Sequence, residues 1–198
     1  MTQIGIFGGT FDPPHLGHLI LGAEALYQLR LERLLWMLTP QPPHKPGQEI
    51  SDSQTRLTML RLAIEDEPRF EVSRIEIERP GPHYTIDSLR LLQAQFPQAE
   101  LIFLMGGDSL RDLPGWRDPA AILAACRLGV MRRPGDQIDL TALEARLPGA
   151  AQRVQFLDAP LLEISSREIR QRVRENAAFR YYLPPKVYDY IQQNRLYR

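Results

Sequence analysis

The sequence predicts an α/β fold in which a mostly parallel sheet carries helices on both faces. Short apolar runs typical of buried strands alternate along the chain with segments of helical periodicity, the pattern of an open parallel sheet. The run Leu101–Met105 is apolar throughout and stops at two glycines, where a parallel sheet places ligand contacts. No internal repeat or linker divides the chain, so we expect residues 1–198 to form a single doubly wound, Rossmann-like domain.

The expected strands are short and apolar. Five runs predict strands: Ile4–Phe7, Leu34–Leu38, Leu101–Met105, Leu128–Met131 and Val154–Leu157. Another run alternates apolar with polar residues and predicts a half-buried or edge strand that contains Phe70, Val72, Ile75 and Ile77.

Apolar stripes and caps predict the helices. The first helix should run from about Leu16 to Leu29. Ser51 and Gln54 have the spacing of a capping box for a second helix, and Thr85 is expected to cap a third. The stripes expected to face the core are Leu57, Leu60 and Ile64 in the second helix and Ile86, Leu89 and Leu92 in the third.

Composition and charge bound the class of protein. Lys+Arg and Asp+Glu contribute 24 residues each, so no basic excess would attract nucleic acid. The single cysteine excludes an intrachain disulfide and suits a reducing compartment. No apolar run approaches a membrane-spanning length, and the first residues enter a strand without a signal peptide. We therefore expect a cytoplasmic protein with no membrane partner, and a homo-oligomer is compatible with the sequence.

The segment Gly8–His18 carries the strongest functional signal. It reads Gly-Gly-Thr-Phe-Asp-Pro-Pro-His-Leu-Gly-His and lies between the first expected strand and helix. Glycines let backbone amides approach a ligand, and a helix start offers unpaired N–H groups and the positive end of its dipole. His15 and His18 are three residues apart and share a face of a helical turn, while Gly17 leaves room beside them. The segment predicts a phosphate site toward which two imidazoles point.

A structural role or a metal site would also explain the histidine pair. A zinc site needs further ligands, and the remaining candidates His44, His83 and Cys126 stand at no ligand-like spacing. Carboxylates would also serve as ligands, but no residue pattern points to them. We therefore expect no protein-held metal and favour the phosphate site.

A second segment near the C-terminus, Ile-Ser-Ser-Arg-Glu-Ile-Arg, predicts another anion-binding helix start. Ser165 and Glu168 have the spacing of a capping box. The Ser166 hydroxyl and the guanidinium groups of Arg167 and Arg170 would add donors to the first amides of this helix. Taken alone, the segment is equally a capped surface helix with solvated arginines. Together with the first segment it is persuasive, because a polyphosphate requires donors from two sides.

The two segments together resemble the paired signatures of the HxGH nucleotidylyltransferases, and within that superfamily the chain most resembles the bacterial nicotinate-nucleotide adenylyltransferases. The resemblance covers essentially the whole chain. Besides the two signatures, it is carried by Gly8–Pro13, Pro42–Lys45, Tyr84-Thr85, Gly106–Leu110, Pro114–Trp116, Arg132–Gly135 and Leu183-Pro184. One departure is Arg167, where many relatives carry a small polar residue, and this difference does not affect the assignment to the family.

The resemblance implies transfer of AMP from ATP to nicotinate mononucleotide, which gives nicotinate adenine dinucleotide and pyrophosphate in NAD biosynthesis. The residue types agree with this chemistry. A phosphate monoester has a second pKa of about 6 and is largely ionised at neutral pH, so its attack needs no general base. Catalysis then consists of aligning two anions and stabilising charge with cationic and N–H donors, with Mg²⁺ held mainly by the ATP phosphates.

The resemblance also implies roles for individual residues. The catalytic residues would be His15, His18 and Arg170. ATP and its phosphates would contact Gly8, Gly9, Thr10, Phe11, Gly17, Lys45, Ile164, Ser165, Ser166 and Arg167. Nicotinate mononucleotide would contact His44, Tyr84, Thr85, Gly106, Asp108, Trp116 and Arg133. In this assignment the Trp116 indole stacks on the pyridine ring and Asp108 contacts a ribose hydroxyl. From the residues alone, Trp116 is equally a loop anchor and Thr85 equally a helix cap.

Three alternatives remain open from the sequence. A sister enzyme of the same fold would adenylylate phosphopantetheine or nicotinamide mononucleotide, although the chain length, the Pro-Pro-His-Lys loop and Trp116 argue against phosphopantetheine. A non-catalytic nucleotide-binding module would be expected to have lost a histidine of the pair or Arg170, and all are present. A dinucleotide-dependent oxidoreductase would be expected to carry Gly-x-Gly-x-x-Gly, which the first loop lacks.

Overall fold

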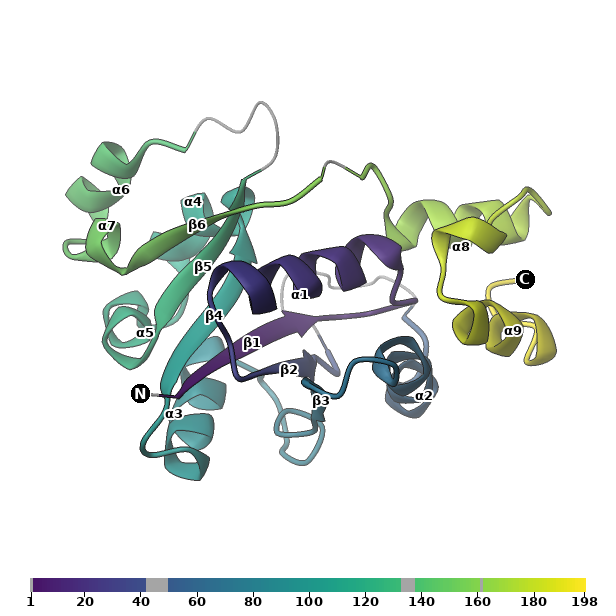
Figure 1. Cartoon of the computed structure of the whole chain (residues 1–198), viewed down its shortest axis with the longest axis horizontal. Coiled ribbons are helices and arrows are strands. Elements are labelled where there is room, and N and C mark those ends of the chain that lie inside the picture. Colours follow the sequence, from purple (N-terminus) through teal and green to yellow (C-terminus); the bar gives the residue numbers. More distant parts are fainter. Residues whose placement is uncertain (1, 42–49, 133–137, 161) are drawn as a thin grey trace.

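The structure is a computed structural model that describes residues 2–41, 50–132, 138–160 and 162–198. Figure 1 shows its helices arranged around a twisted central sheet. The strands are β1 Gln3–Gly9, β2 Arg33–Leu38, β3 Phe70–Ser73, β4 Glu100–Gly106, β5 Arg127–Arg132 and β6 Val154–Asp158. The α-helices are α1 Leu16–Gln28, α2 Ser53–Ile64, α3 Thr85–Gln95, α4 Gly107–Asp112, α5 Pro119–Ala125, α6 Leu140–Arg146, α7 Ala150–Arg153, α8 Ser166–Arg174 and α9 Pro185–Gln193. The short 3-10 helices are η1 Leu113–Gly115 and η2 Arg180–Tyr182.

The described strands form one parallel sheet in the order β3-β2-β1-β4-β5-β6. The chain moves outward from β1 to β3, crosses back to β4 beside β1, and then moves outward in the other direction to β6. The strand order therefore reverses between β1 and β4. In sheets of this kind, ligands bind at that reversal, beyond the carboxyl ends of the strands. The predicted doubly wound parallel sheet is confirmed.

A hydrophobic core lies on each face of the sheet. Successive side chains of a strand point to opposite faces, so Ile4 and Ile6 of β1 pack in one core and Phe7 packs in the other. Helices α1, α2, α8 and α9 cover the face of Phe7, whereas α3, α4, α5 and α6 cover the face of Ile4. The predicted stripes are buried as expected, at 5% exposure or less: Leu57, Leu60, Ile64, Ile86, Leu89 and Leu92.

Two predicted helix caps are wrong by one residue. Helix α2 is capped by Asp52, whose carboxylate accepts a hydrogen bond from a first-turn amide at 2.9 Å. The expected cap, Ser51, instead donates its backbone N–H to the buried Asp12 carboxylate at 3.1 Å. Helix α3 starts after Tyr84, whose backbone is still extended, so Thr85 is already helical and is not the cap.

The predicted edge strand is present but shorter than expected. Strand β3 lies at the end of the strand order and stops at Ser73. Ile75 and Ile77 lie in a turn, where the Glu78 N–H donates to the Arg74 carbonyl at 3.0 Å. These two isoleucines pack against different cores, which explains their alternation without a strand.

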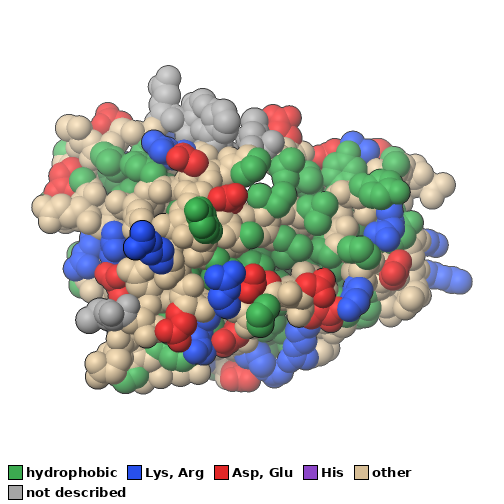
Figure 2. Space-filling view, viewed as in Figure 1, with side chains coloured by type: hydrophobic (Ala, Val, Ile, Leu, Met, Phe, Trp, Pro, Cys, Tyr) green, Lys and Arg blue, Asp and Glu red, His purple; other side chains and the backbone are tan. Residues whose placement is uncertain are grey.

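The surface agrees with the balanced composition. Figure 2 shows Lys and Arg side chains interspersed with Asp and Glu side chains over one face of the molecule. Among the described residues, no helix is both long enough and apolar enough to cross a bilayer.

Candidate active site

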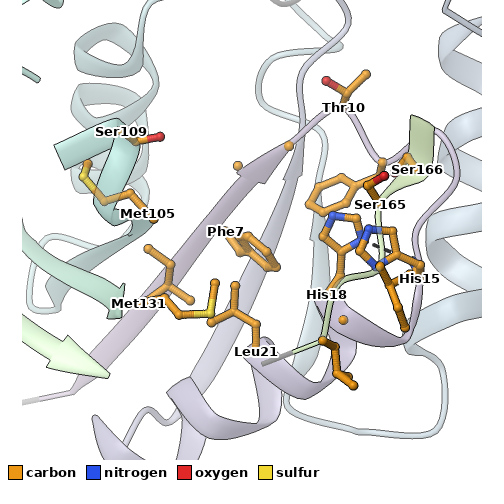
Figure 3. A pocket seen from close by; sticks show the side chains of 18 of the residues that line it. Phe7, Thr10, His15, His18, Leu21, Met105, Ser109, Met131, Ser165 and Ser166 are labelled. Carbon is orange, nitrogen blue, oxygen red and sulfur yellow. Dashed lines mark hydrogen bonds between the residues drawn. The ribbon is translucent and has the colours of Figure 1, made fainter. Parts of the chain in front are cut away.

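A cavity of about 1090 Å³ lies at the point where the strand order reverses. The ends of β1, β4 and β5, the start of α1 and the start of α8 all contribute to its wall (Figure 3). Pockets for one small molecule usually measure roughly 300–1,000 Å³. The cavity is therefore large enough for two substrates or for a dinucleotide.

The two histidines of the first segment lie side by side on this wall. His15 is the N-cap of α1, and its backbone N–H donates to His18 Nδ1 at 3.1 Å. Figure 3 shows their rings side by side, and they stack with a centroid distance of 3.6 Å. Because Nδ1 of His18 accepts this hydrogen bond, the proton of the neutral ring is on Nε2. His18 is thereby held in the tautomer that presents an Nε2–H donor.

His15 is neutral at physiological pH. Its side chain is 7% exposed, and burial lowers its pKa from 6.5 to about 4. The ring nitrogen Nδ1 is buried and has no hydrogen-bond partner within the described part of the chain. A Cβ atom at Gly17 would lie 3.1 Å from this nitrogen, so a glycine keeps the space beside it open. The His15 side chain faces the His18 N–H in the capping box of α1, so this buried nitrogen lies against the helix start and not in the cavity.

The second segment forms a capped helix start, as predicted, and lies against the first. The Ser165 hydroxyl caps α8 by accepting a first-turn N–H at 3.1 Å. The Ser166 hydroxyl donates to the Pro13 carbonyl at 2.8 Å, and Arg170 Nη1 donates to the Asp12 carbonyl at 2.6 Å. Two helix starts that are about 150 residues apart in the sequence therefore face one cavity and are joined by hydrogen bonds.

A buried arginine supports the loop between β1 and α1. Arg56 of α2 is 1% exposed, and its guanidinium group donates to the carbonyl oxygens of Thr10 and Thr39 at 2.9 Å each. Phe11 is also buried, and its ring packs edge-on against His18 at 5.2 Å. Nothing in the local sequence pattern marks Arg56, because three of its partners are backbone carbonyls of the distant residues Thr10, Thr39 and Pro40.

Most of the residues assigned from the sequence lie on the cavity wall: Gly8, Gly9, Thr10, Phe11, His15, Gly17, His18, Gly106, Asp108, Trp116, Ile164, Ser165, Ser166, Arg167 and Arg170. Tyr84 and Thr85 are not among the lining residues. His44, Lys45 and Arg133 lie outside the described residues.

The wall also contains two arginines that the sequence analysis did not assign. Arg174 follows Arg170 by four residues on α8, so the two project from the same helix face. This spacing was a signal available in the sequence. Arg132 ends β5 and pairs with Asp158 at 2.8 Å. Arg174 adds positive charge to the side of the cavity formed by α8, whereas the charge of Arg132 is offset by Asp158.

The far side of the cavity, at the end of β4, carries a carboxylate and an indole. Asp108 lies in the first turn of α4, and a Cβ atom at Gly106 would come within 2.6 Å of its carboxylate. Trp116 follows η1, and its ring meets Phe103 edge-on at 6.2 Å. Tyr84 lies near this loop, because the guanidinium of Arg117 stands 5.3 Å above its ring. Of the expected acceptor residues, Gly106, Asp108 and Trp116 therefore line the cavity, whereas Tyr84 does not.

Comparisons with known proteins agree with this geometry. Residues 6–172 match the cytidylyltransferase-like family. The probable nicotinate-nucleotide adenylyltransferase of Thermomicrobium roseum is 47% identical over 198 residues, which are 100% of this chain and 92% of the relative. The nicotinate-nucleotide adenylyltransferase of Bacillus subtilis is 39% identical, with 100% and 99% covered. The structure of the Plasmodium falciparum nicotinic acid mononucleotide adenylyltransferase complexed with NaAD superimposes with a TM-score of 0.82 at 19% identity, over 100% of this chain and 98% of that one.

The fold and the two joined helix starts define a nucleotidyltransferase. The chain belongs to the cytidylyltransferase-like family and, within it, to the family of the nicotinate-nucleotide adenylyltransferases. The resemblance predicted from the two signatures is confirmed, and the oxidoreductase alternative is excluded.

Proposed function

We propose that this enzyme transfers the AMP group of ATP to nicotinate mononucleotide and forms nicotinate adenine dinucleotide and pyrophosphate. The observation that carries the proposal is the junction of the two helix starts. Ser166 and Arg170 of α8 are hydrogen-bonded to the loop before α1, so donors from both segments surround one cavity. The residues on its wall come from positions 7 to 174, which supports one nucleotidylyltransferase domain over residues 1–198.

The reaction is an in-line nucleophilic substitution at the α-phosphorus of ATP. An oxygen of the nicotinate mononucleotide phosphate forms a bond with the α-phosphorus of ATP. The bond from this phosphorus to the oxygen that bridges to the β-phosphate breaks, and pyrophosphate leaves with the electron pair. The attacking phosphate is already largely ionised at neutral pH, since its second pKa is about 6, so no side chain has to remove a proton. The work of the protein is alignment and charge stabilisation.

The donors for the moving charge come from both segments. His18 presents Nε2–H, because its Nδ1 accepts the backbone N–H of His15. Arg170 contributes a guanidinium that is oriented by its hydrogen bond to the Asp12 carbonyl. Arg167 and Arg174 extend this charge along the same helix, and the phosphates of ATP are assigned to this side. Fixed donors of this kind stabilise charge that develops in the transition state without having to reorganise.

The wall of the cavity fits a metal that arrives with the nucleotide. No group of three or more His, Cys, Asp or Glu side chains in the described ranges could hold an ion by itself. Magnesium would instead bind the phosphate oxygens, and Asp108 is the acidic side chain on the described wall. When bound, the ion would neutralise part of the negative charge of the triphosphate.

Nicotinate mononucleotide is assigned to the end of the cavity near β4. The indole of Trp116 would stack on the pyridine ring, and Asp108 would accept a hydrogen bond from a ribose hydroxyl. Tyr84 and Thr85 do not line the cavity, so any contact from them requires a local movement. We place the reaction in the cytoplasm, as expected from the single cysteine, which is buried.

A pyrophosphate-release assay tests the proposal directly. The purified enzyme is supplied with ATP, magnesium and one of three acceptors: nicotinate mononucleotide, nicotinamide mononucleotide or phosphopantetheine. We expect the highest kcat/KM with nicotinate mononucleotide and a dinucleotide product confirmed by mass spectrometry. A preference for another acceptor would assign the chain to a sister activity. ATP binding without turnover of any acceptor would support a non-catalytic nucleotide-binding module.

A further inference from the structure

The C-terminal end of the chain reaches back to the loop that leads into the histidine pair. The Tyr197 hydroxyl donates a hydrogen bond to Asp12 Oδ1 at 2.6 Å, across 185 positions of sequence. Burial, together with the nearby Asp12 carboxylate, raises the pKa of the Tyr197 phenol above its ordinary value, so the phenol stays protonated. It is therefore a permanent donor to this carboxylate.

Asp12 is held from three directions. Its side chain is 2% exposed, and Oδ2 accepts the backbone N–H of Ser51 at 3.1 Å. Its carbonyl oxygen accepts Arg170 Nη1 at 2.6 Å. A buried carboxylate is stable only when its oxygens are hydrogen-bonded, so Tyr197 and Ser51 together allow Asp12 to occupy this position. The segments that meet at Asp12 come from the start of α2, from α8 and from the C-terminus.

The loop needs this support because its backbone is not in a relaxed conformation. Phe11 has a φ of 49°, which is the left-handed region and is unfavourable for a bulky side chain. Such a conformation persists only where the surroundings determine it. Phe11 is between Thr10 and Asp12 in the sequence, and Thr10 and His15 of the same loop both lie on the cavity wall. A shift of Asp12 would therefore move cavity residues on both sides of it.

We propose that Tyr197 is a positioning residue for adenylyl transfer, which acts by holding Asp12 and thereby the loop of residues 10–15 against the phosphates. The proposal rests on the function proposed above, but the effect on the loop is independent of it. Tyr197 does not line the cavity, so its contribution is exerted through Asp12 rather than through contact with a substrate. The C-terminal segment is in this sense part of the active-site scaffold.

The test compares Tyr197→Phe with the control Tyr181→Phe. Both changes remove one hydroxyl, but Tyr181 is 88% exposed and lies outside the cavity wall. Steady-state kinetics with ATP and nicotinate mononucleotide, expressed per folded molecule from circular dichroism, separates kcat from the two KM values. Amide hydrogen exchange of residues 10–18 in the ligand-free protein reports the loop without any need for turnover.

In Tyr197→Phe we expect kcat to fall by about 10-fold while the KM for nicotinate mononucleotide stays within about twofold, because misplacement by 1 Å can cost up to ~100-fold in rate. Exchange in residues 10–18 should become faster than in the control. In an Asp12→Ala background, the Tyr197→Phe change should have no further effect on kcat, since the residue acts through Asp12.

Three results would overturn the proposal: kcat and exchange equal to those of Tyr181→Phe, a loss of activity that matches a loss of folded protein, or effects of the two substitutions that multiply. Inactivity of the wild type with nicotinate mononucleotide would instead refute the proposed function. The exchange comparison would still decide whether Tyr197 holds the loop.

Discussion

Acidification should destabilise the ligand-free protein through His15. In the unfolded chain this imidazole takes up a proton below its ordinary pKa of 6.5, whereas in the folded protein burial keeps it neutral down to about pH 4. Between these values the unfolded state binds more protons, so the free energy of unfolding falls as the pH falls. The contribution is complete above pH 6.5 and is lost progressively toward pH 4.

The size of the effect follows from the two pKa values. One pKa unit corresponds to about 1.4 kcal/mol, so a shift from 6.5 to about 4 is worth about 3 kcal/mol once the pH is below both values. Between pH 7 and pH 5, the linkage relation predicts a loss of about 2 kcal/mol from this group. This is a large part of the stability of an ordinary domain, which is roughly 5–15 kcal/mol.

Urea unfolding at pH 7 and pH 5 measures this contribution. His15→Gln removes the titrating group and keeps a polar side chain, so the pH-dependent loss should be about 2 kcal/mol smaller in this variant than in the wild type. His18 stacks on His15, so the same change is also made in a His18→Gln background, where His18 cannot titrate. Parallel loss of stability in the two proteins, or an NMR titration of His15 with a pKa near 6.5, would refute the reasoning.

Three further predictions concern the reaction. His18→Ala should lower kcat by roughly 100-fold, because its Nε2–H donor is needed most in the transition state, and it should cost about 1 kcal/mol of stability because the hydrogen bond from the His15 N–H is lost; a folded variant with near wild-type kcat would contradict the assignment. Arg170→Ala should raise the KM for ATP and lower kcat/KM, and it should reduce the free energy of unfolding by about 1–3 kcal/mol because its bond to Asp12 is lost; denaturant unfolding and kinetics together check this, and unchanged kinetics would leave Arg170 a purely structural residue. Trp116→Ala should raise the KM for nicotinate mononucleotide and for its nicotinamide counterpart alike while ATP affinity stays constant, since stacking depends little on the carboxylate. An unchanged KM for both acceptors would contradict the assignment of Trp116 to the acceptor pocket.

Local features of the chain were sufficient to predict much of the site. The histidine pair, the capped start of α8 and the glycines at the ends of β1 and β4 are all defined by residues a few positions apart. Parallel strands end on the same edge of the sheet, so these segments were expected to meet. The cavity wall contains most of the residues assigned on this basis, and their roles in substrate binding remain predictions.

The errors arose where distant contacts compete with local preferences. Ser51 has the spacing of a cap, but its backbone N–H is bonded to Asp12, and the next residue caps α2. Thr85 resembles a cap, yet it is helical and does not line the cavity. Ile75 and Ile77 alternate like a strand because each packs against a different core. Periodicity alone cannot distinguish these cases, since it records only which side chains are apolar.

The sequence by itself determined the fold class, the two helix starts that line the cavity and the family of this protein, because short-range patterns and motifs specify each of them. Only the tertiary structure decided that Arg56 supports the Thr10 carbonyl and that Tyr197 holds Asp12. These two contacts join residues 46 and 185 positions apart. Such contacts exist only after the sheet and both helical layers have assembled, and no local pattern of side chains specifies them.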